Sequence, residues 1–168
     1  MRVAVTDACI FIDLFDLQLT RHLFDLDLEI HTSSDVIGEL YDEQAEALHL
    51  LAANGRLEIH NINEDARLAI SEMNFPRALS QNDKTVLHLA DRFQAMVLSS
   101  DQVVRNYAVK CGLECHGMLW VLDTLIEKDI INPKLAAKKL QALLETNIMY
   151  RNNMKLSAEI QKRLLIWL

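Results

Sequence analysis

The sequence contains little glycine and proline, which limits how much of it can be flexible. Four glycines and two prolines are spread over 168 residues, and no stretch rich in serine, glycine and proline separates the apolar segments. Neither a linker nor a disordered tail is therefore expected. We predict one domain over residues 1–168, with a core at about 2–130 and a helical segment at about 133–168.

Long hydrophobic runs are also absent. No stretch approaches the roughly 18 uncharged apolar residues of a membrane span, so no contact with a membrane is expected. The opening MRVAVTDACIFIDLF lacks a basic start and a small-residue cleavage site, which argues against a signal peptide. The three cysteines, an odd number, are interpreted as reduced thiols. Together these features predict a cytoplasmic protein.

Positive charge is in short supply, since the formal net charge is -7. This excludes a broad basic surface that coats nucleic acid through many phosphate contacts. It does not exclude a nuclease, because a divalent cation held by several carboxylates can meet a phosphate in place of lysine.

Hydrophobic periodicity predicts alternating strands and helices. Strands are expected at about 2–6, 28–34, 56–62, 96–100 and 113–116, and helices after Asp7 and at about 34–55, 63–73, 80–95 and 102–112, with further helices from Gly117 onward. Segments of this length call for right-handed crossovers between parallel strands. The predicted class is therefore α/β, with a parallel sheet covered by helices on both faces.

Acidic residues recur where such a sheet binds its ligands. Asp7 and Asp101 directly follow predicted strands, at the edge where open parallel sheets form their ligand crevice. Asp83 lies in the first turn of a predicted helix, and Glu39 lies about one turn inside another. Four carboxylates at one edge would repel one another unless a cation were present. Because no convincing histidine or cysteine set accompanies them, the pattern indicates Mg²⁺ or Mn²⁺.

Each of these residues also has an ordinary structural interpretation. Asp83 follows Ser80 by three residues, as in a capping box, and Asp101 could cap its own helix. Asp7 could simply end a strand, and Glu39 could be a solvated residue on an exposed helix face. The residues alone leave both interpretations open.

Four segments, taken together and in order, resemble the motifs of PIN domains. They are VAVTDACIFIDLF with Asp7 and a second aspartate, Asp13; SSDVIGEL with Glu39; LSQNDKTVLHLA with Asp83; and VLSSDQVVRNYAVKCGL with Asp101. With the continuation GMLWVLDTLIEKDII, the resemblance spans about residues 2–145. It implies a three-layer α/β/α sandwich with a central parallel sheet, here followed by extra C-terminal helices.

The resemblance implies a metal-dependent endoribonuclease that hydrolyses RNA phosphodiesters, and for a chain of this length the toxin of a toxin–antitoxin pair. Asp7, Glu39, Asp83 and Asp101 would hold Mg²⁺ or Mn²⁺ directly or through water and so serve catalysis. Ser99, Ser100 and Arg105 would contact the substrate. RNA, an antitoxin protein and a second copy of the chain, forming a homodimer, are the implied partners.

The sequence departs from the family at Cys9, where PIN proteins usually have a hydroxyl or amide residue two positions after the first aspartate. A thiol is a weaker hydrogen-bond partner, so a catalytically weak or inactive PIN-like binding module is the main alternative. An aspartate-based phosphotransfer domain is a further alternative, although Asp7-Ala8-Cys9 lacks the second aspartate that dehalogenase-like phosphatases need. The six histidines show no helical i, i+4 pair and no HExxH pattern, which argues against zinc-dependent hydrolysis.

Overall fold

The computed structural model describes all residues from 1 to 168, and they fall into two compact units. Unit 1 comprises Met1–Ile12 and Asp27–Met118, and unit 2 comprises Asp13–Leu26 and Leu119–Leu168. Unit 2 therefore combines a short N-terminal segment with the C-terminal helices. The single domain predicted from the sequence, with a boundary near residue 130, stays a prediction.

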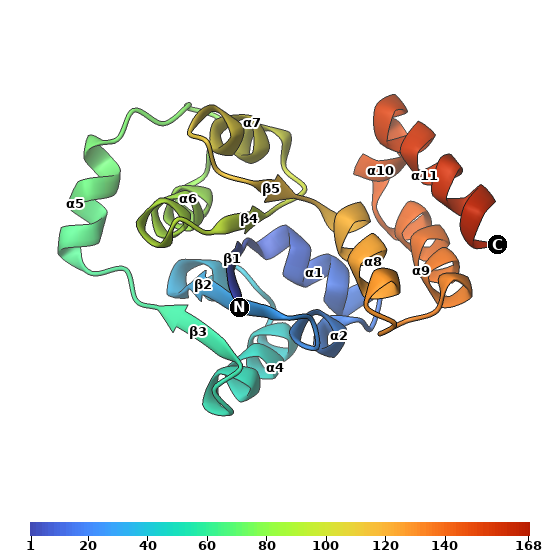
Figure 1. Ribbon diagram of the computed structural model, residues 1–168. Helices are drawn as coiled ribbons and strands as arrows, with labels where there is room; N and C mark the ends of the chain where they lie inside the picture. The colour runs from blue at the N-terminus through green and yellow to red at the C-terminus, as the bar shows by residue number, and fades with distance from the viewer. The chain divides into compact units, whose positions relative to one another are not determined.

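Unit 1 is built on a sheet of five parallel strands in the order β3-β2-β1-β4-β5 (Figure 1). The strands are β1 (Arg2–Thr6), β2 (Leu28–Ser33), β3 (Leu57–His60), β4 (Met96–Leu98) and β5 (Cys115–His116). In the register, Val5 of β1 lies beside His31 of β2 and Val97 of β4. The carboxyl ends of the central strands therefore meet at one edge, and the predicted α/β class with a parallel sheet is confirmed.

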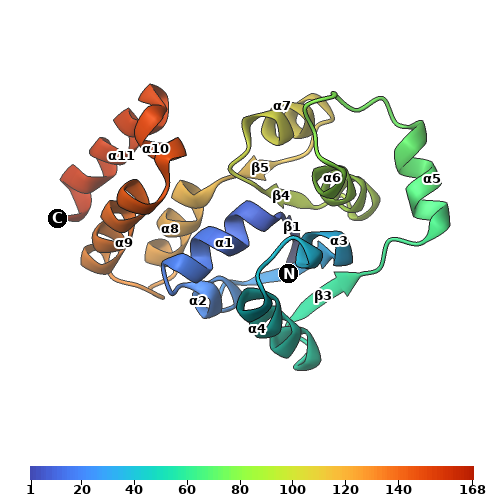
Figure 2. The same ribbon diagram turned by 180° about the vertical axis from the view of Figure 1, so that it is seen from behind.

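Helices cover both faces of this sheet. In chain order the helices of unit 1 are α1 (Ala8–Asp16), which begins in this unit, α3 (Ser34–Gly38), α4 (Asp42–Ala53), α5 (Glu64–Glu72), α6 (Gln81–Phe93) and α7 (Gln102–Lys110). Helix α5 stands apart from the sheet (Figures 1 and 2). Figures 1 and 2 show α4 on one side of the sheet and α6 and α7 on the other. Helix α6 buries Val86, Leu87 and Ala90 and contacts β1, β2 and β4. The result is the three-layer α/β/α arrangement that the sequence predicted.

The single helix predicted at about 34–55 is wrong, because two helices occupy this segment. Helix α3 ends at Gly38, and α4 begins at Asp42. Glycine lowers helix propensity at the break, and the backbone N–H of Tyr41 donates to Oε1 of Gln44 at 3.0 Å, which supports a new helix start. Glu39 therefore lies at the end of a short helix and not inside a long one.

Unit 2 consists of helices. They are α2 (Thr20–Phe24), α8 (Met118–Glu127), α9 (Pro133–Thr146), α10 (Ile148–Asn152) and α11 (Met154–Trp167). The helical segment predicted at about 133–168 consists of three helices, since Asn147 and Asn153 each accept a backbone N–H with the side chain and start a new helix.

The apolar face of the last helix packs inside unit 2. Ile160, Leu164 and Trp167 of α11 are buried, together with Leu140 and Leu143 of α9. Helices α9, α10 and α11 contact one another, and Arg163 of α11 forms an ion pair with Asp123 of α8 at 2.8 Å. None of the helices in the chain combines the length and the apolar character needed to cross a membrane.

Candidate functional site

Asp7 is held at the carboxyl edge of the sheet by its neighbours in the chain and by the adjacent strand. Its backbone N–H donates to the carbonyl of Leu98 at 3.2 Å, which places it beside the end of β4. Its carboxylate accepts the backbone N–H of Ile10 at 3.1 Å and a hydrogen bond from the Ser99 hydroxyl. The Cys9 thiol donates to the two carboxylate oxygens at 3.0 and 3.1 Å. Cys9 thus takes the supporting position for which the resemblance to PIN domains implies a hydroxyl or amide residue.

The Asp7 side chain is only 3% exposed, and this burial controls its ionisation. Burial raises the pKa of Asp7 to about 6, because the charged form loses its hydration. The hydrogen bonds from Cys9, Ser99 and Ile10 lower the pKa, while the negative charge of Asp83 raises it further. None of the groups bonded to the carboxylate is a cation. At neutral pH, Asp7 is therefore a buried anion with a second carboxylate close by.

Asp83 forms the capping box that its ordinary structural interpretation predicted. Its backbone N–H donates to Oγ of Ser80 at 3.1 Å, and its Oδ2 accepts the backbone N–H of Ser80 at 3.2 Å. This reciprocal pair is a capping box at the start of α6. Since α6 lies over β1, the same cap brings the half-buried Asp83 close enough to influence the pKa of Asp7.

Asp101 caps α7, as its ordinary structural interpretation predicted. Its Oδ1 accepts the backbone N–H groups of Val103 at 2.8 Å and Val104 at 3.1 Å, and the residue is exposed. Its own backbone N–H donates to Oγ of Ser99 at 3.1 Å, the hydroxyl that also bonds Asp7. Ser99 therefore links Asp7 to the Asp101 turn. The Oδ2 atom of Asp101 takes no part in the cap.

The structure does not gather all four predicted carboxylates into one cluster. Glu39 is exposed at the end of α3, and Asp35 of the same helix is paired with Arg67, with distances of 3.0 and 2.8 Å. Nowhere in the chain could a group of three or more histidine, cysteine, aspartate or glutamate side chains, placed as they are, hold a metal ion. Asp7 and Asp83 interact, whereas metal binding by Glu39 and Asp101 stays a prediction.

Arg105 and the serines lie around the end of β4. The Arg105 guanidinium is hydrogen-bonded to the Cys115 thiol. Gly117 lies close to Arg105 and Ser99, since a Cβ atom added to Gly117 would be 3.4 Å from Nη2 of Arg105 and 3.5 Å from the carbonyl oxygen of Ser99. The same Cβ would be 3.6 Å from Oγ of Ser100. These residues therefore border the edge that carries Asp7, while their contact with a substrate stays a prediction. Burial raises the pKa of Cys115 to about 11, so its thiol stays neutral.

The donors at this edge suit a hard divalent cation. The carboxylates of Asp7 and Asp83 and the Ser99 hydroxyl are oxygen donors, which Mg²⁺ and Mn²⁺ prefer over nitrogen or sulfur. Mg²⁺ is usually held by one or two protein carboxylates and keeps several of its waters, so it does not need a cage of three acidic residues. A dication would also offset the buried charge of Asp7 and its repulsion from Asp83.

A second polar network, which the sequence analysis did not predict, lies where β2 meets β3. Nδ1 of His31 is 2.8 Å from Nε2 of His60, and Nε2 of His31 is 2.8 Å from Oε1 of Glu29. The two ring planes differ by 20°, and the ring centroids are 5.0 Å apart. Because the two nitrogens are only 2.8 Å apart at this centroid distance, the rings meet edge to edge. Phe93 of α6 contacts both rings. The tetrapeptide Leu-Glu-Ile-His, present in both strands, is the signal that could have indicated this pair.

Comparisons with known proteins relate the chain to one protein family. Residues 3–164 match a family model described as a PIN domain. A search of curated proteins finds no match. Among solved structures, the chain is similar to a PilT N-terminus domain protein, SSO1118, from the hyperthermophilic archaeon Sulfolobus solfataricus P2. The identity is 13%, the TM-score is 0.48, and the match covers 74% of this chain and 94% of that one.

The family assignment follows from the extent of the family match. It covers nearly the whole chain, including β2 to β5, all of β1 except Arg2, and the segments with Asp7, Asp83 and Asp101. PIN domains are generally nucleases, and they typically use divalent metal ions. The chain therefore belongs to the PIN domain family.

Proposed function

We propose that this chain is a metal-dependent endoribonuclease that hydrolyses RNA phosphodiesters with Mg²⁺ or Mn²⁺, and that Asp7 and Asp83 form the centre of its active site. The observation that carries the proposal is the buried Asp7 carboxylate, which has a second carboxylate beside it and no cation bonded to it. Such an arrangement costs stability, and groups with strongly shifted pKa values are concentrated at functional sites. In a PIN domain, binding a divalent cation is the function that explains this cost.

The residues around Asp7 prepare its carboxylate for this role. Cys9, Ile10 and Ser99 fix the orientation of the carboxylate, and above a pH of about 6 it is an anion. When bound, Mg²⁺ or Mn²⁺ would lower the pKa of a water molecule for attack on phosphorus and neutralise charge on the phosphate. Arg105 lies on the same edge and supplies a cation for the phosphodiester.

Glu39 and Asp101 complete the proposed metal site as outer members. Asp101 keeps Oδ2 outside its helix cap, and Glu39 is exposed at the end of α3. A metal-bound water can bridge either carboxylate, because Mg²⁺ retains several waters in protein sites. We therefore expect substitution of Glu39 or Asp101 to weaken metal binding less than substitution of Asp7.

We also propose that the nuclease is the toxin of a toxin–antitoxin pair, acts in the cytoplasm and forms a homodimer. This part rests on the family resemblance. In addition, α11 exposes Leu165 and Ile166, which are 84% and 77% exposed and provide apolar surface for self-association. Light scattering of the purified chain measures its oligomeric state, and a neighbouring reading frame for a small DNA-binding protein would support the antitoxin.

The test is cleavage of a panel of labelled RNAs by the wild type and by Asp7→Asn, in Mn²⁺ and in EDTA. We expect the wild type to cut in Mn²⁺ only and Asp7→Asn not to cut. Asp27→Asn is the matched control, because it removes the same charge from an exposed residue outside the site and should leave cleavage unchanged. Equal cutting by the wild type and Asp7→Asn, or cutting in EDTA, would refute the mechanism.

A binding module without turnover is the second candidate, and one observation favours it. The Cys9 thiol, a weak hydrogen-bond donor, supports the Asp7 carboxylate where PIN domains usually have a hydroxyl or amide residue. In that case the wild type would bind Mn²⁺, and Asp7→Asn would bind it less well, but neither would cut any RNA of the panel. The cleavage assay together with a Mn²⁺ titration therefore separates the two functions.

A further inference from the structure

A small pocket lies between α7 and the segment that leads from α5 to α6. Its volume is about 250 Å³, and its lining consists of Asn74, Pro76, Val103, Asn106, Tyr107 and Lys110. Both views show this connecting segment passing beside α7 (Figures 1 and 2). Phe75 packs against Tyr107 with ring centroids 4.9 Å apart, which holds the tyrosine ring in place. Since pockets for drug-sized ligands begin at about 300 Å³, this one suits a single ring system.

The pocket begins next to the proposed active site. Val103 lines it, and the backbone N–H of Val103 donates to the Asp101 carboxylate at 2.8 Å. The pocket then follows α7 by way of Asn106 and Tyr107 to Lys110, over two turns of the helix. An RNA strand with a phosphate at the Asp7 edge would therefore have neighbouring nucleotides within reach of the pocket.

The segments that line the pocket carry more positive than negative charge, unlike the whole chain. Residues 73–82 and 102–113 contain three cations, Arg77, Arg105 and Lys110, and no acidic residue other than Asp101, Asp83 and their like outside these ranges, although the net charge of the protein is -7. Burial raises the pKa of Tyr107 and the negative charge of Asp91 in α6 raises it further, so one acidic residue of another segment also lies near the ring. Lys110 and the side-chain amides of Asn74 and Asn106 surround an otherwise mainly apolar lining. An aromatic ring, amides and a lysine together match the flat face, the polar edge and the phosphate of a nucleotide.

We propose that this pocket binds one unpaired nucleobase of the RNA strand, close to the phosphodiester that is cut. The proposal rests on the proposed function for its substrate class, RNA. Tyr107 offers its ring to the face of the base, the amides of Asn74 and Asn106 meet the base edge, and Lys110 pairs with the adjoining phosphate. The chain would therefore prefer single-stranded RNA, whose bases are free to leave the stack.

Binding is measured by fluorescence anisotropy of a labelled single-stranded oligoribonucleotide, with every variant made in the Asp7→Asn chain so that nothing is cut. Since base–aromatic stacking contributes about 1–3 kcal/mol per base, Tyr107→Ala should raise Kd about fivefold or more. Tyr107→Phe keeps the ring and should keep the affinity. A Kd for Tyr107→Ala equal to that of the parent would overturn the proposal.

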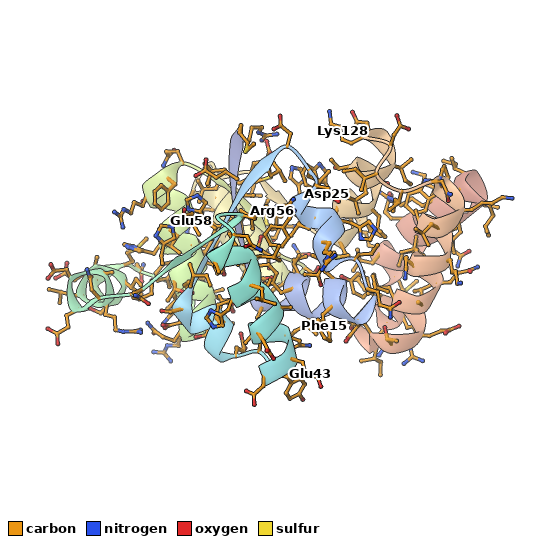
Figure 3. All side chains as sticks on the ribbon, turned by 90° about the horizontal axis from the view of Figure 1, so that it is seen from below. Phe15, Asp25, Glu43, Arg56, Glu58 and Lys128 are labelled. Carbon is orange, nitrogen blue, oxygen red and sulfur yellow. The ribbon has the colours of Figure 1, made fainter.

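Matched controls separate the pocket from general effects of ring or charge loss. Tyr41→Ala removes a tyrosine that is 81% exposed and directly precedes α4. Lys128→Ala removes a lysine that points outward at the end of α8 (Figure 3). Neither should change Kd, whereas Lys110→Ala should raise it. If Lys128→Ala and Lys110→Ala raise Kd equally, the binding is unspecific charge attraction and the pocket has no role.

An abasic series tests the contact with the base directly. Each nucleotide of the oligomer is replaced in turn by an abasic one, and one position should raise Kd about fivefold in the Asp7→Asn chain. The same position should have no effect once Tyr107→Ala is added, because the partner of the base is gone. An equal loss in both chains, or no sensitive position, would overturn the proposal.

The two proposals fail in different ways. If the pocket variants and the abasic series behave as expected but the wild type cuts no RNA, base binding stands and nuclease activity falls. If the wild type cuts RNA in Mn²⁺ but no abasic position responds to Tyr107→Ala, nuclease activity stands and the nucleobase pocket falls.

Discussion

Asp7→Asn should make the folded protein more stable at neutral pH while it abolishes RNA cleavage. Asparagine has the shape of aspartate, and its carbonyl oxygen can still accept the backbone N–H of Ile10 and a bond from the Cys9 thiol. Its amide can donate to Oγ of Ser99, since a hydroxyl oxygen accepts two hydrogen bonds. The substitution therefore removes the buried charge with little change in packing.

The size of the effect follows from the pKa of Asp7, which rises from 3.8 in the unfolded chain to about 6 in the folded protein. One pKa unit corresponds to 1.36 kcal/mol, so the charge costs about 3 kcal/mol of unfolding free energy. Above pH 6 the carboxyl is ionised in both states and the full cost is present. As the pH falls from 6 to 3.8 the folded state takes up its proton first, so the cost disappears.

Urea unfolding at a series of pH values measures this. Allowing for weaker hydrogen bonds to asparagine, we expect Asp7→Asn to exceed the wild type by about 1–3 kcal/mol at pH 7.5 and to equal it near pH 4. Asp13 titrates in both proteins and cancels in the difference. Asp7→Ala is the contrast, because it leaves a cavity and unpaired donors and should destabilise. A lower stability of Asp7→Asn at pH 7.5, or an advantage that does not change with pH, would refute the reasoning.

Three further predictions concern other contacts. The hydroxyl of Tyr150 donates to the buried Asp13 carboxylate at 3.1 Å. Tyr150→Phe should therefore raise the pKa of Asp13 above about 6 and lower the unfolding free energy at pH 8 by about 1–3 kcal/mol, as measured by urea unfolding. Burial lowers the pKa of His60, so His60 itself disfavours the folded state as the pH falls below 6.5, and thermal unfolding should show the wild type less stable relative to His60→Gln at pH 5 than at pH 7.5. A hydroxyl is a stronger donor than a thiol, so Cys9→Ser should lower the pKa of Asp7 and move the acidic limb of the Mn²⁺-dependent cleavage rate to lower pH; an unmoved limb would contradict a role for Asp7 ionisation.

Much of the fold could be predicted because strands and helix starts depend on nearby residues. The apolar run of β4 and the β-branched run of β1 agree with the predicted strands to within two residues. The caps at Ser80 and Asp101 are formed by bonds that span at most three residues, so they too can be inferred from the sequence. The break at Glu39 was missed because the apolar pattern continues across it, while Leu40 turns inward and is buried.

The candidate site could be predicted only in part. The positions of Asp7 and Asp101 after strands follow from their places in the sequence, and the structure puts both residues at the carboxyl edge of the sheet. The interaction of Asp7 with Asp83 depends on how α6 packs over β1, which no local pattern reveals. The position of Arg105, bonded to Cys115 of β5, likewise follows from strand pairing.

The sequence by itself determined the alternation of strands and helices, the helix caps and the acidic residue types at the strand ends, because each depends on residues a few positions apart. Only the tertiary structure decided which acidic side chains meet, how deeply Asp7 is buried and that His31 lies against His60. The physical reason is that burial and register arise from strand order and helix packing. The pKa of a carboxyl group shifts because segments distant in the sequence pack around it and exclude water.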